Sequence, residues 1–244
     1  MKVLAHRGAS GDYPENTILS FKKALELNVY GLELDVHKCM DGNLVIIHDE
    51  DIQRTFKGKG LVKDYTLREL KKFDCRKFEF IKNLDCKIPT LREVFELIKD
   101  IDIILNIEAK TDLIHYDLEQ DILNLIKEYN FEDKILISSF NHHSLKIFKS
   151  LNNNIKYGAL YDSKKDYMPY DNVVDHAKKL GVYSINISKD LVSKEIVDLA
   201  HKNNLKVFVY TVNSPITMRK MINFNVDGVF SDYPDLMSEI INEY

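Results

Sequence analysis

Short runs of β-branched and other apolar residues alternate along the chain with longer stretches in which apolar residues recur every three or four positions. Runs of the first kind predict strands, and the longer stretches predict amphipathic helices. The expected strands are Val3–His6, Gly31–Val36, Ile103–Glu108, Ile135–Ser139, Lys156–Tyr161, Ser184–Ile187, Lys206–Thr211 and Gly228–Ser231. The expected helices are Asn16–Leu27, Leu91–Ile98, Leu118–Tyr129, His142–Leu151, Lys194–Asn203 and Ile216–Phe224.

Strands that alternate with helices predict a parallel sheet covered by helices on its outside. An open doubly wound sheet shares this pattern, but it more often carries a Gly-rich phosphate loop after its first strand, and none is visible here. Eight strands in 244 residues, close to the ~250 residues of a typical (β/α)8 barrel, favour closure. The expected fold class is therefore α/β, a TIM-type barrel. No Pro-, Gly- or Ser-rich linker divides the chain, so residues 1–244 are expected to form one domain.

The segment from about residue 37 to residue 89 interrupts the alternation. Asp41-Gly42 is a favourable tight-turn dipeptide, and it leads into an extra strand at Leu44–His48. A short helical stretch follows near Leu67–Phe73. We expect this segment to be a small insertion after the second strand, on the face that carries the catalytic loops.

The charge balance argues against nucleic acid as a partner. Lys and Arg total 34 against 38 Asp and Glu, which gives a formal net charge of −4. A mildly acidic chain offers no general positive field. An anionic substrate must therefore be held by a local site.

Several features predict a cytoplasmic protein. No apolar stretch approaches the ~18 residues that a membrane span requires. The start of the chain, MKVLAHRGAS, has no apolar core of a secretory signal. The three cysteines (Cys39, Cys75 and Cys86) are odd in number and lack CxxC spacing, so free thiols are expected.

Carboxylates stand at the ends of two expected neighbouring strands. Glu33 and Asp35 lie two residues apart on one strand, so they point to the same side, and Glu108 ends the next barrel strand. Buried carboxylates need a positive partner. A salt-bridge cluster with Arg7 and Lys110 would explain one pair, but three carboxylates at successive strand ends favour a metal site. Oxygen ligands without thiolate suit Ca²⁺ or Mg²⁺, with Mn²⁺ possible, better than zinc.

His6 and His48 follow the first strand and the inserted strand and are the acid–base candidates, because imidazole titrates near neutral pH. Arg7 and Lys110 are candidate phosphate ligands. The remaining histidines are expected in helices or loops as surface or packing residues: His37, His115, His142, His143, His176 and His201.

Two further residues near the first helix have structural explanations. Asn16 is predicted to be the N-cap of that helix. Glu15 sits favourably at a helix start. It could also support Arg7 from behind, although we do not expect that support to be needed.

Taken together, these motifs resemble the glycerophosphodiester phosphodiesterase family. The resemblance covers nearly the whole chain, and the order and spacing of its motifs are more specific than any single one. The matching motifs are His6-Arg7-Gly8, Pro14-Glu15-Asn16-Thr17, Glu33-Leu34-Asp35-Val36, Asp41-Gly42 before His48-Asp49, Arg54-Thr55, Gly58-Lys59-Gly60, Ile88-Pro89-Thr90-Leu91, Glu93-Val94, Asn106-Ile107-Glu108-Ala109-Lys110, Ser139-Phe140, Asp227-Gly228 and Ser231-Asp232-Tyr233-Pro234.

The resemblance implies a barrel with an inserted subdomain and a metal-dependent reaction. Glycerophosphodiesters such as glycerophosphocholine or glycerophosphoethanolamine would be cleaved to glycerol 3-phosphate and an alcohol. Glu33, Asp35 and Glu108 would hold the metal, and the histidine pair would exchange protons. Arg7 and Lys110 would contact phosphate.

The seventh strand departs from the family pattern. The family usually has Trp-Thr-Val-Asn at its end, whereas this chain has Tyr210-Thr211-Val212-Asn213 and no Trp at all. An aromatic residue here is expected to pack on the glycerol part of the substrate, and Phe140 could line the same pocket. Tyr keeps the flat face but adds a hydroxyl that needs a partner.

Two other functions share this site. A lysophospholipase D would need an apolar groove or a membrane-binding surface, and no basic amphipathic helix is visible. A barrel that only binds glycerophosphodiesters is disfavoured because every required group is present. The sequence leaves open the cation, the preferred headgroup, the oligomeric state, which histidine is the acid, and whether water or the substrate's 2-hydroxyl is the nucleophile.

Overall fold

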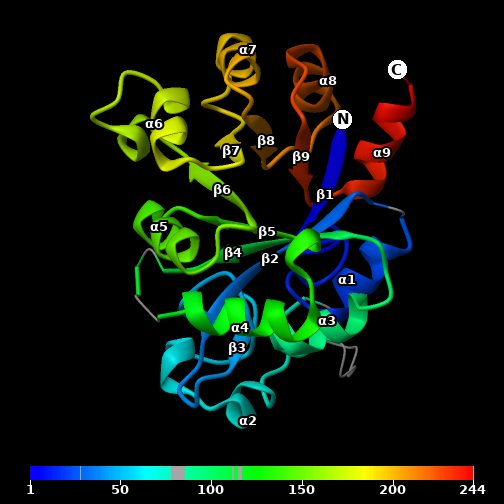
Figure 1. Ribbon diagram of the computed structural model, residues 1–244. Helices are drawn as coiled ribbons and strands as arrows, with labels where there is room; N and C mark the ends of the chain where they lie inside the picture. The colour runs from blue at the N-terminus through cyan, green and yellow to red at the C-terminus, as the bar shows by residue number, and fades with distance from the viewer. Residues whose placement is uncertain (28, 78–85, 112, 115–116, 244) are drawn as a thin grey trace.

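A closed barrel of parallel strands forms the centre of the computed structural model, which describes residues 1–27, 29–77, 86–111, 113–114 and 117–243 (Figure 1). The pairing of β1 with β2, in which Leu4 lies opposite Gly31, closes the ring. This arrangement confirms the predicted (β/α)8 barrel. Its strands are β1 (Lys2–His6), β2 (Gly31–Lys38), β4 (Ile104–Ala109), β5 (Ile135–Ser139), β6 (Lys156–Tyr161), β7 (Ser184–Ser188), β8 (Lys206–Tyr210) and β9 (Gly228–Ser231).

Helices between the strands cover the outside of the barrel (Figure 1). They are α1 (Ile18–Leu25), α3 (Leu91–Ile98), α4 (Glu119–Tyr129), α5 (His142–Leu151), α6 (Val173–Leu180), α7 (Lys194–Lys202), α8 (Pro215–Phe224) and α9 (Pro234–Asn242). Two of them, α6 and α9, are not among the helices that the sequence pattern predicts. The buried residues of both recur at helical spacing (Val174, Ala177 and Leu180 in α6; Pro234, Met237 and Ile240 in α9), so the pattern was present in the sequence but was not recognised.

Apolar side chains fill the barrel unevenly. The main core lies between the strands and the outer helices, where buried aliphatic residues pack on both sides. Inside the barrel, Leu4, Phe208 and Phe230 form a separate buried cluster. On β2 and β4 the inward positions nearer the carboxyl ends of the strands carry polar residues instead. Space for a ligand therefore remains at the end of the barrel where catalytic groups are usually found.

The chain between β2 and α3 contains β3 (Leu44–Ile46), which pairs antiparallel with β2, and the short helix α2 (Leu67–Leu70). Its buried apolar residues form a cluster of their own: Cys39, Val45, Ile47, Ile52, Phe56, Val62, Leu70, Cys75, Cys86 and Ile88. The extra strand is shorter than predicted: it ends at Ile46, although the backbone N–H of Ile47 still bonds to the carbonyl oxygen of Asp35, at 3.1 Å. Within the described residues, none of the helices has the length and apolar character needed to cross a bilayer.

Candidate active site

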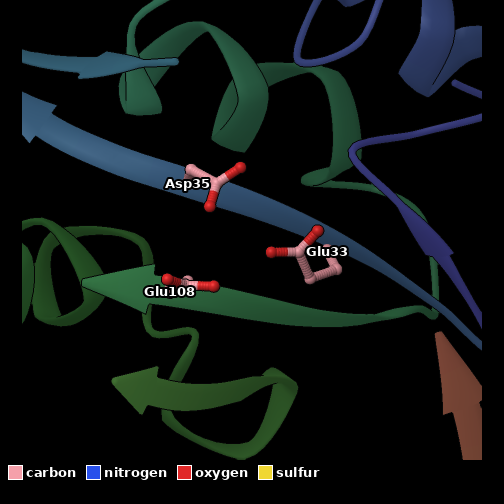
Figure 2. Close-up of side chains that lie close together, drawn as sticks. All are labelled: Glu33, Asp35 and Glu108. Atoms are coloured by element: carbon pink, nitrogen blue, oxygen red, sulfur yellow. The ribbon is translucent and has the colours of Figure 1, made fainter. Parts of the chain in front are cut away.

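Three carboxylates gather on the inner side of β2 and β4, as Figure 2 shows. Glu33 and Asp35 alternate with outward residues on β2, and Asp35 pairs in register with Glu108 on β4. One oxygen atom from each carboxylate lies within 4.8 Å of the others. The predicted metal-ligand set is thus brought together in space.

The cations near these carboxylates do not neutralise all three. Lys110 Nζ lies 2.7 Å from Glu108 Oε1 and 3.9 Å from Asp35 Oδ1. Arg7 Nε lies 3.2 Å from Asp35 Oδ2. Within the described part of the chain, Glu33 accepts only the backbone N–H of Arg7, at 2.9 Å. The predicted salt-bridge alternative therefore forms, but it leaves Glu33 without a cationic side chain.

The nearby cations stabilise the charge of Asp35 but not that of Glu33, as the pKa shifts of the two carboxylates show. Burial, and then the charges of Asp35 and Glu108, raise the pKa of Glu33 well above its ordinary value. Burial also acts to raise the pKa of Asp35, but Arg7 and Lys110 outweigh it and bring that pKa below its ordinary value.

A divalent cation fits this donor set. Asp35 Oδ1 is buried and accepts no hydrogen bond from any described residue. A cation held by the three carboxylates would give that oxygen a partner and offset the repulsion that raises the pKa of Glu33. Oxygen donors without thiolate suit a hard divalent cation.

His6 is held by a carboxylate from the other end of the chain. Its Nδ1 lies 2.6 Å from Asp232 Oδ1. Because a carboxylate accepts the proton in such a bond, Nδ1 is the protonated nitrogen and Nε2 remains to exchange protons. Ser10 Oγ and Asn213 Nδ2 also donate to Asp232, at 3.0 and 2.6 Å. Burial acts to raise the pKa of Asp232, but these contacts, above all that with His6, lower it to about 2.

His48 has the same arrangement with its neighbour in sequence. Its Nδ1 lies 2.6 Å from Asp49 Oδ1, and its Nε2 lies 3.5 Å from Lys110 Nζ. The His48 carbonyl oxygen is 3.0 Å from His37 Nε2. The prediction that His37 lies in a helix or loop is wrong: β2 extends through it to pair with β3, which buries the ring beneath His48.

Arg7 links several of these groups through an unusual backbone conformation. Its φ of +58° lies in the left-handed region, which turns its N–H toward Glu33. Its guanidinium donates from Nη1 to Glu15 Oε1, at 3.0 Å, and approaches Asp35. Glu15 also accepts two hydrogen bonds from Arg54. Glu15 is thus a direct partner of Arg7.

The predicted N-cap role of Asn16 is wrong. Thr17 caps α1, and its side chain accepts the N–H of Ser20. Asn16 has a φ of +55°, is 1 % exposed, and donates from Nδ2 to Asp35 Oδ2 at 2.8 Å. Its left-handed backbone turns the amide away from the helix and into the barrel. There it holds a metal-ligand candidate.

A small open cavity lies beside these groups. Its lining includes His6, Arg7, Glu33, His48, Glu108, Asn106, Ser138, Phe140, Leu160, Tyr210, Thr211 and Phe230. Asp35 and Lys110 are not among the lining residues. The rings of Phe140 and Tyr210 meet edge to face, with centroids 6.0 Å apart at 86°. The structure therefore sets an apolar wall beside the charged groups.

The Tyr210 hydroxyl is buried and has no hydrogen-bond partner among the described residues. Burial, followed by the charges of Asp162 and Glu108, raises the pKa of Tyr210. The backbone of Tyr161 lies near enough to the hydroxyl to lower this pKa somewhat, but no described group has the geometry of a full hydrogen bond to it.

Sequence reasoning missed the partners that orient the predicted residues. Asp49, directly after His48, and Asp232, in the last strand motif, were visible in the sequence but received no role. Arg54 stood in the Arg54-Thr55 motif and likewise received no role. Of the histidines expected to be surface or packing residues, His115 lies outside the described residues.

The structure is a (β/α)8 barrel that gathers a buried carboxylate cluster and two aspartate-bonded histidines at the carboxyl ends of its strands, where barrel enzymes carry their active sites. Residues 6–236 match the model of the Glycerophosphoryl diester phosphodiesterase family. The chain belongs to that family.

Two relatives that match over nearly their whole length are named glycerophosphodiester phosphodiesterases. A glycerophosphodiester phosphodiesterase of Caldanaerobacter subterraneus is 42% identical over 99% of this chain and 98% of its own. One from Bacillus altitudinis is 37% identical over 99% of this chain and 98% of its own.

Solved structures agree with the sequence relatives. A phosphodiesterase of Oleispira antarctica, in complex with the product sn-glycerol-3-phosphate, is 30% identical, with a TM-score of 0.88 and coverage of 99% of this chain and 97% of that one. The glycerophosphodiester phosphodiesterase of Thermotoga maritima is 33% identical, with a TM-score of 0.82 and 98% coverage of both chains.

Proposed function

We propose that this protein hydrolyses glycerophosphodiesters, such as glycerophosphocholine or glycerophosphoethanolamine, to glycerol 3-phosphate and an alcohol, with the help of a divalent cation. One observation carries the proposal: a single cavity is lined by two histidines and by carboxylates of a buried acidic cluster. The product named with the Oleispira structure supports the same reaction class.

Glu33, Asp35 and Glu108 would hold the cation, for which Ca²⁺ and Mg²⁺ are the first choices and Mn²⁺ the next. A bound cation of this kind supplies positive charge to a phosphate oxygen and to the charge that develops during cleavage. Asn16 and Arg7 keep the Asp35 carboxylate in place through its Oδ2 atom.

His6 and His48 would move the protons. Each ring is fixed through Nδ1 by a carboxylate, Asp232 or Asp49, so each offers Nε2 to the substrate. One histidine accepts a proton from the nucleophile, which is either water or the substrate's own 2-hydroxyl. The other donates a proton to the oxygen of the leaving alcohol. Two fixed imidazoles can do both at neutral pH.

Arg7 and Lys110 would bind the phosphate oxygens. Arg7 lines the cavity and is turned toward it by its left-handed backbone. Lys110 is buried and lies near both Glu108 and His48. Phe140 and Tyr210 form the wall against which the glycerol carbons would pack.

The broader setting is also a proposal. Residues 1–244 would act as one domain, with the segment of about 37–89 as an insertion, because His48 from that segment lines the same cavity as His6. A cytoplasmic location is supported by the three cysteines, Cys39, Cys75 and Cys86, which are buried as thiols rather than joined in disulfides. The partner would be a small-molecule diester and not nucleic acid, since the net charge is −4.

The test is release of glycerol 3-phosphate from glycerophosphocholine and glycerophosphoethanolamine by purified protein. The assay is run after chelation and again with Ca²⁺, Mg²⁺ or Mn²⁺ restored. We expect release that depends on the cation. Release that is undiminished by chelation would contradict the metal dependence. Folded protein that cleaves neither diester with any cation, but does cleave lysophospholipids, would overturn the proposed substrate.

A further inference from the structure

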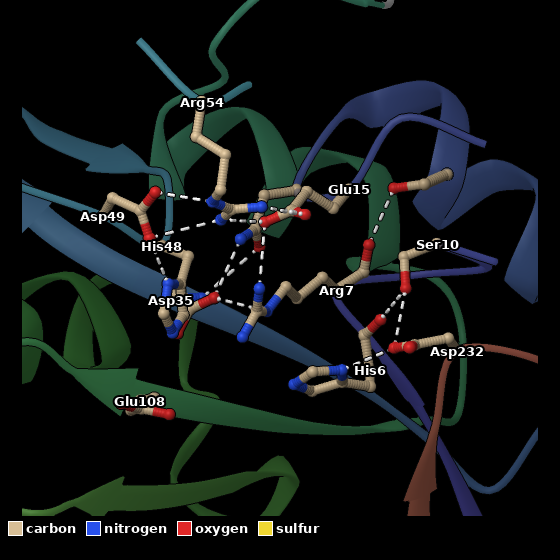
Figure 3. Close-up of polar contacts among 12 residues, drawn as sticks. His6, Arg7, Ser10, Glu15, Asp35, His48, Asp49, Arg54, Glu108 and Asp232 are labelled. Atoms are coloured by element: carbon tan, nitrogen blue, oxygen red, sulfur yellow. Dashed lines mark hydrogen bonds and ion pairs between the residues drawn. The ribbon is translucent and has the colours of Figure 1, made fainter. Parts of the chain in front are cut away.

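The guanidinium of Arg54 lies between two carboxylates that come from different parts of the chain (Figure 3). Its Nε donates to Asp49 Oδ2 at 2.6 Å, and its Nη2 reaches Asp49 Oδ1 at 3.3 Å. Its Nη1 and Nη2 donate to the two oxygens of Glu15, at 2.7 and 2.8 Å. One planar group therefore makes two forked contacts.

Each of these carboxylates holds a group in the active site. Asp49 accepts the Nδ1 proton of His48 at 2.6 Å, and Glu15 accepts from Arg7 Nη1 at 3.0 Å. Both His48 and Arg7 line the cavity, whereas Arg54 is not among the residues that line it. Arg54 thus contacts neither the cavity nor the acidic cluster. It contacts Asp49 and Glu15, which hold His48 and Arg7.

Stability alone does not explain this arrangement. The side chain of Arg54 is 47% exposed, and ion pairs with so much solvent contact contribute little to folding. The geometry is more demanding than charge neutralisation requires. Four N–H···O contacts from one planar guanidinium fix the direction of both carboxylates, and a lysine ammonium cannot form such a double fork.

We propose that Arg54 is a positioning residue, which aligns His48 through Asp49 and Arg7 through Glu15 and so ties the 37–89 segment to the catalytic groups of the barrel. The proposal rests on the function proposed above. Arg54 would act on that site from outside the cavity. Turnover would then depend on how the 37–89 segment packs against the barrel.

The kinetic test compares Arg54→Ala, Arg54→Lys and wild type on glycerophosphocholine with the cation present. We expect Arg54→Ala to lower kcat about 10- to 100-fold, as is usual when the group behind a catalytic ligand is lost. Arg54→Lys should recover little of the lost kcat. Because the site is half exposed, added guanidinium ion should restore part of the activity of Arg54→Ala. Sodium chloride at the same ionic strength should not.

The two contacts of Arg54, with Asp49 and with Glu15, can be tested separately by further variants. Asp49→Asn should mainly lower kcat, because it disturbs the proton-transferring ring. Glu15→Gln should mainly raise KM, because it disturbs Arg7. Adding Arg54→Ala to Asp49→Asn should lower kcat by less than the product of the two single effects, since both act through His48.

Arg92 provides a matched control, because its guanidinium also forms a forked pair with one glutamate, Glu128, on the outer helices. Arg92→Ala should leave kcat and KM unchanged. The proposal is overturned if folded Arg54→Ala keeps wild-type kcat and KM. It is also overturned if Arg54→Lys equals wild type, or if guanidinium restores nothing.

A second readout does not depend on turnover and separates this proposal from the proposed reaction. The His48 Nδ1 proton, bonded to Asp49, should give a downfield imidazole signal in nuclear magnetic resonance, assigned by its loss in Asp49→Asn. Arg54→Ala should broaden or shift it, and Arg92→Ala should not. An inactive wild type would contradict the proposed reaction alone. An unchanged signal in Arg54→Ala would contradict the positioning role.

Discussion

Asp35 and Glu108 face each other across two neighbouring parallel strands, β2 and β4. Strands in a sheet lie about 4.8 Å apart, so the register alone brings the two side chains within reach of one cation. A shift of one residue would turn Asp35 toward the outer helices. The closed barrel, which locks the register, is therefore part of the metal site.

The first prediction concerns cation binding and stability. Ca²⁺, Mg²⁺ or Mn²⁺ should raise the unfolding temperature, and a cation at 100 times its Kd would add about 2.7 kcal/mol to the free energy of unfolding. Glu108→Gln should remove most of the shift, because the acidic cluster loses a ligand. Glu195→Gln on the exposed surface of α7 should keep it. Thermal unfolding with and without cation measures the shift in unfolding temperature. A shift in Glu108→Gln equal to that of wild type would contradict the site.

The second prediction compares two histidine–aspartate pairs. His6→Ala should lower kcat about 10²- to 10⁴-fold, the usual contribution of an acid–base group. Asp232→Asn should lower it about 10- to 100-fold by loosening the ring. His201 pairs with Asp227 at 2.8 Å on the opposite face, so His201→Ala should leave kcat unchanged. Near-normal turnover in His6→Ala would remove it from the mechanism.

The third prediction separates backbone strain from crowding at two glycines. Gly8 and Gly42 have φ values of +80° and +82°. A Cβ at Gly8 would lie 2.5 to 2.7 Å from atoms of Ser20, whereas a Cβ at Gly42 would meet nothing within 4 Å. Gly42→Ala should lose about 1–2 kcal/mol of stability. Gly8→Ala should lose about 1–3 kcal/mol more, as measured by urea unfolding, because Ser20 must move. Equal losses would show that Ser20 yields freely.

The fourth prediction tests the unpartnered hydroxyl of Tyr210. Tyr210→Phe should leave the free energy of unfolding unchanged or raise it by about 1 kcal/mol, because no hydrogen bond is lost. Tyr157 is the control: its hydroxyl donates to the Asn152 carbonyl at 2.5 Å, so Tyr157→Phe should lose about 0.5–1.5 kcal/mol. A loss of that size in Tyr210→Phe would reveal a partner for its hydroxyl.

The fifth prediction is a pH dependence of stability. Burial lowers the pKa of His142 below its ordinary 6.5 in the folded protein. Below about pH 6.5 the unfolded chain therefore binds a proton that the native state does not, and stability falls with pH, by at most about 1.4 kcal/mol per unit. His142→Gln should flatten this fall, because Gln keeps a donor for the Leu160 carbonyl. His143→Gln, at the exposed neighbour, should not. The free energy of unfolding is measured by urea titration at several pH values between 8 and 5.5. The same pH dependence in both variants would contradict the role of His142.

Local pattern was sufficient for much of the fold. The bounds of β5, β6 and β9 were predicted without error, because each is a short apolar run between polar residues. That Glu33 and Asp35 point to the same side of β2 follows from strand geometry, which has a period of two residues. Residue type alone indicated His6 and His48, since few side chains exchange protons at neutral pH.

Only the tertiary structure decided which groups meet. Asp232 reaches His6 from 226 positions away because barrel closure places β9 beside β1. Arg54 joins Asp49 to Glu15 because the 37–89 segment folds back over the β1–α1 loop. Asn16 serves Asp35 rather than α1, through a left-handed backbone that Asn adopts more readily than most residues do. Sequence patterns report which face a residue occupies, whereas contacts between distant segments depend on how the whole barrel closes.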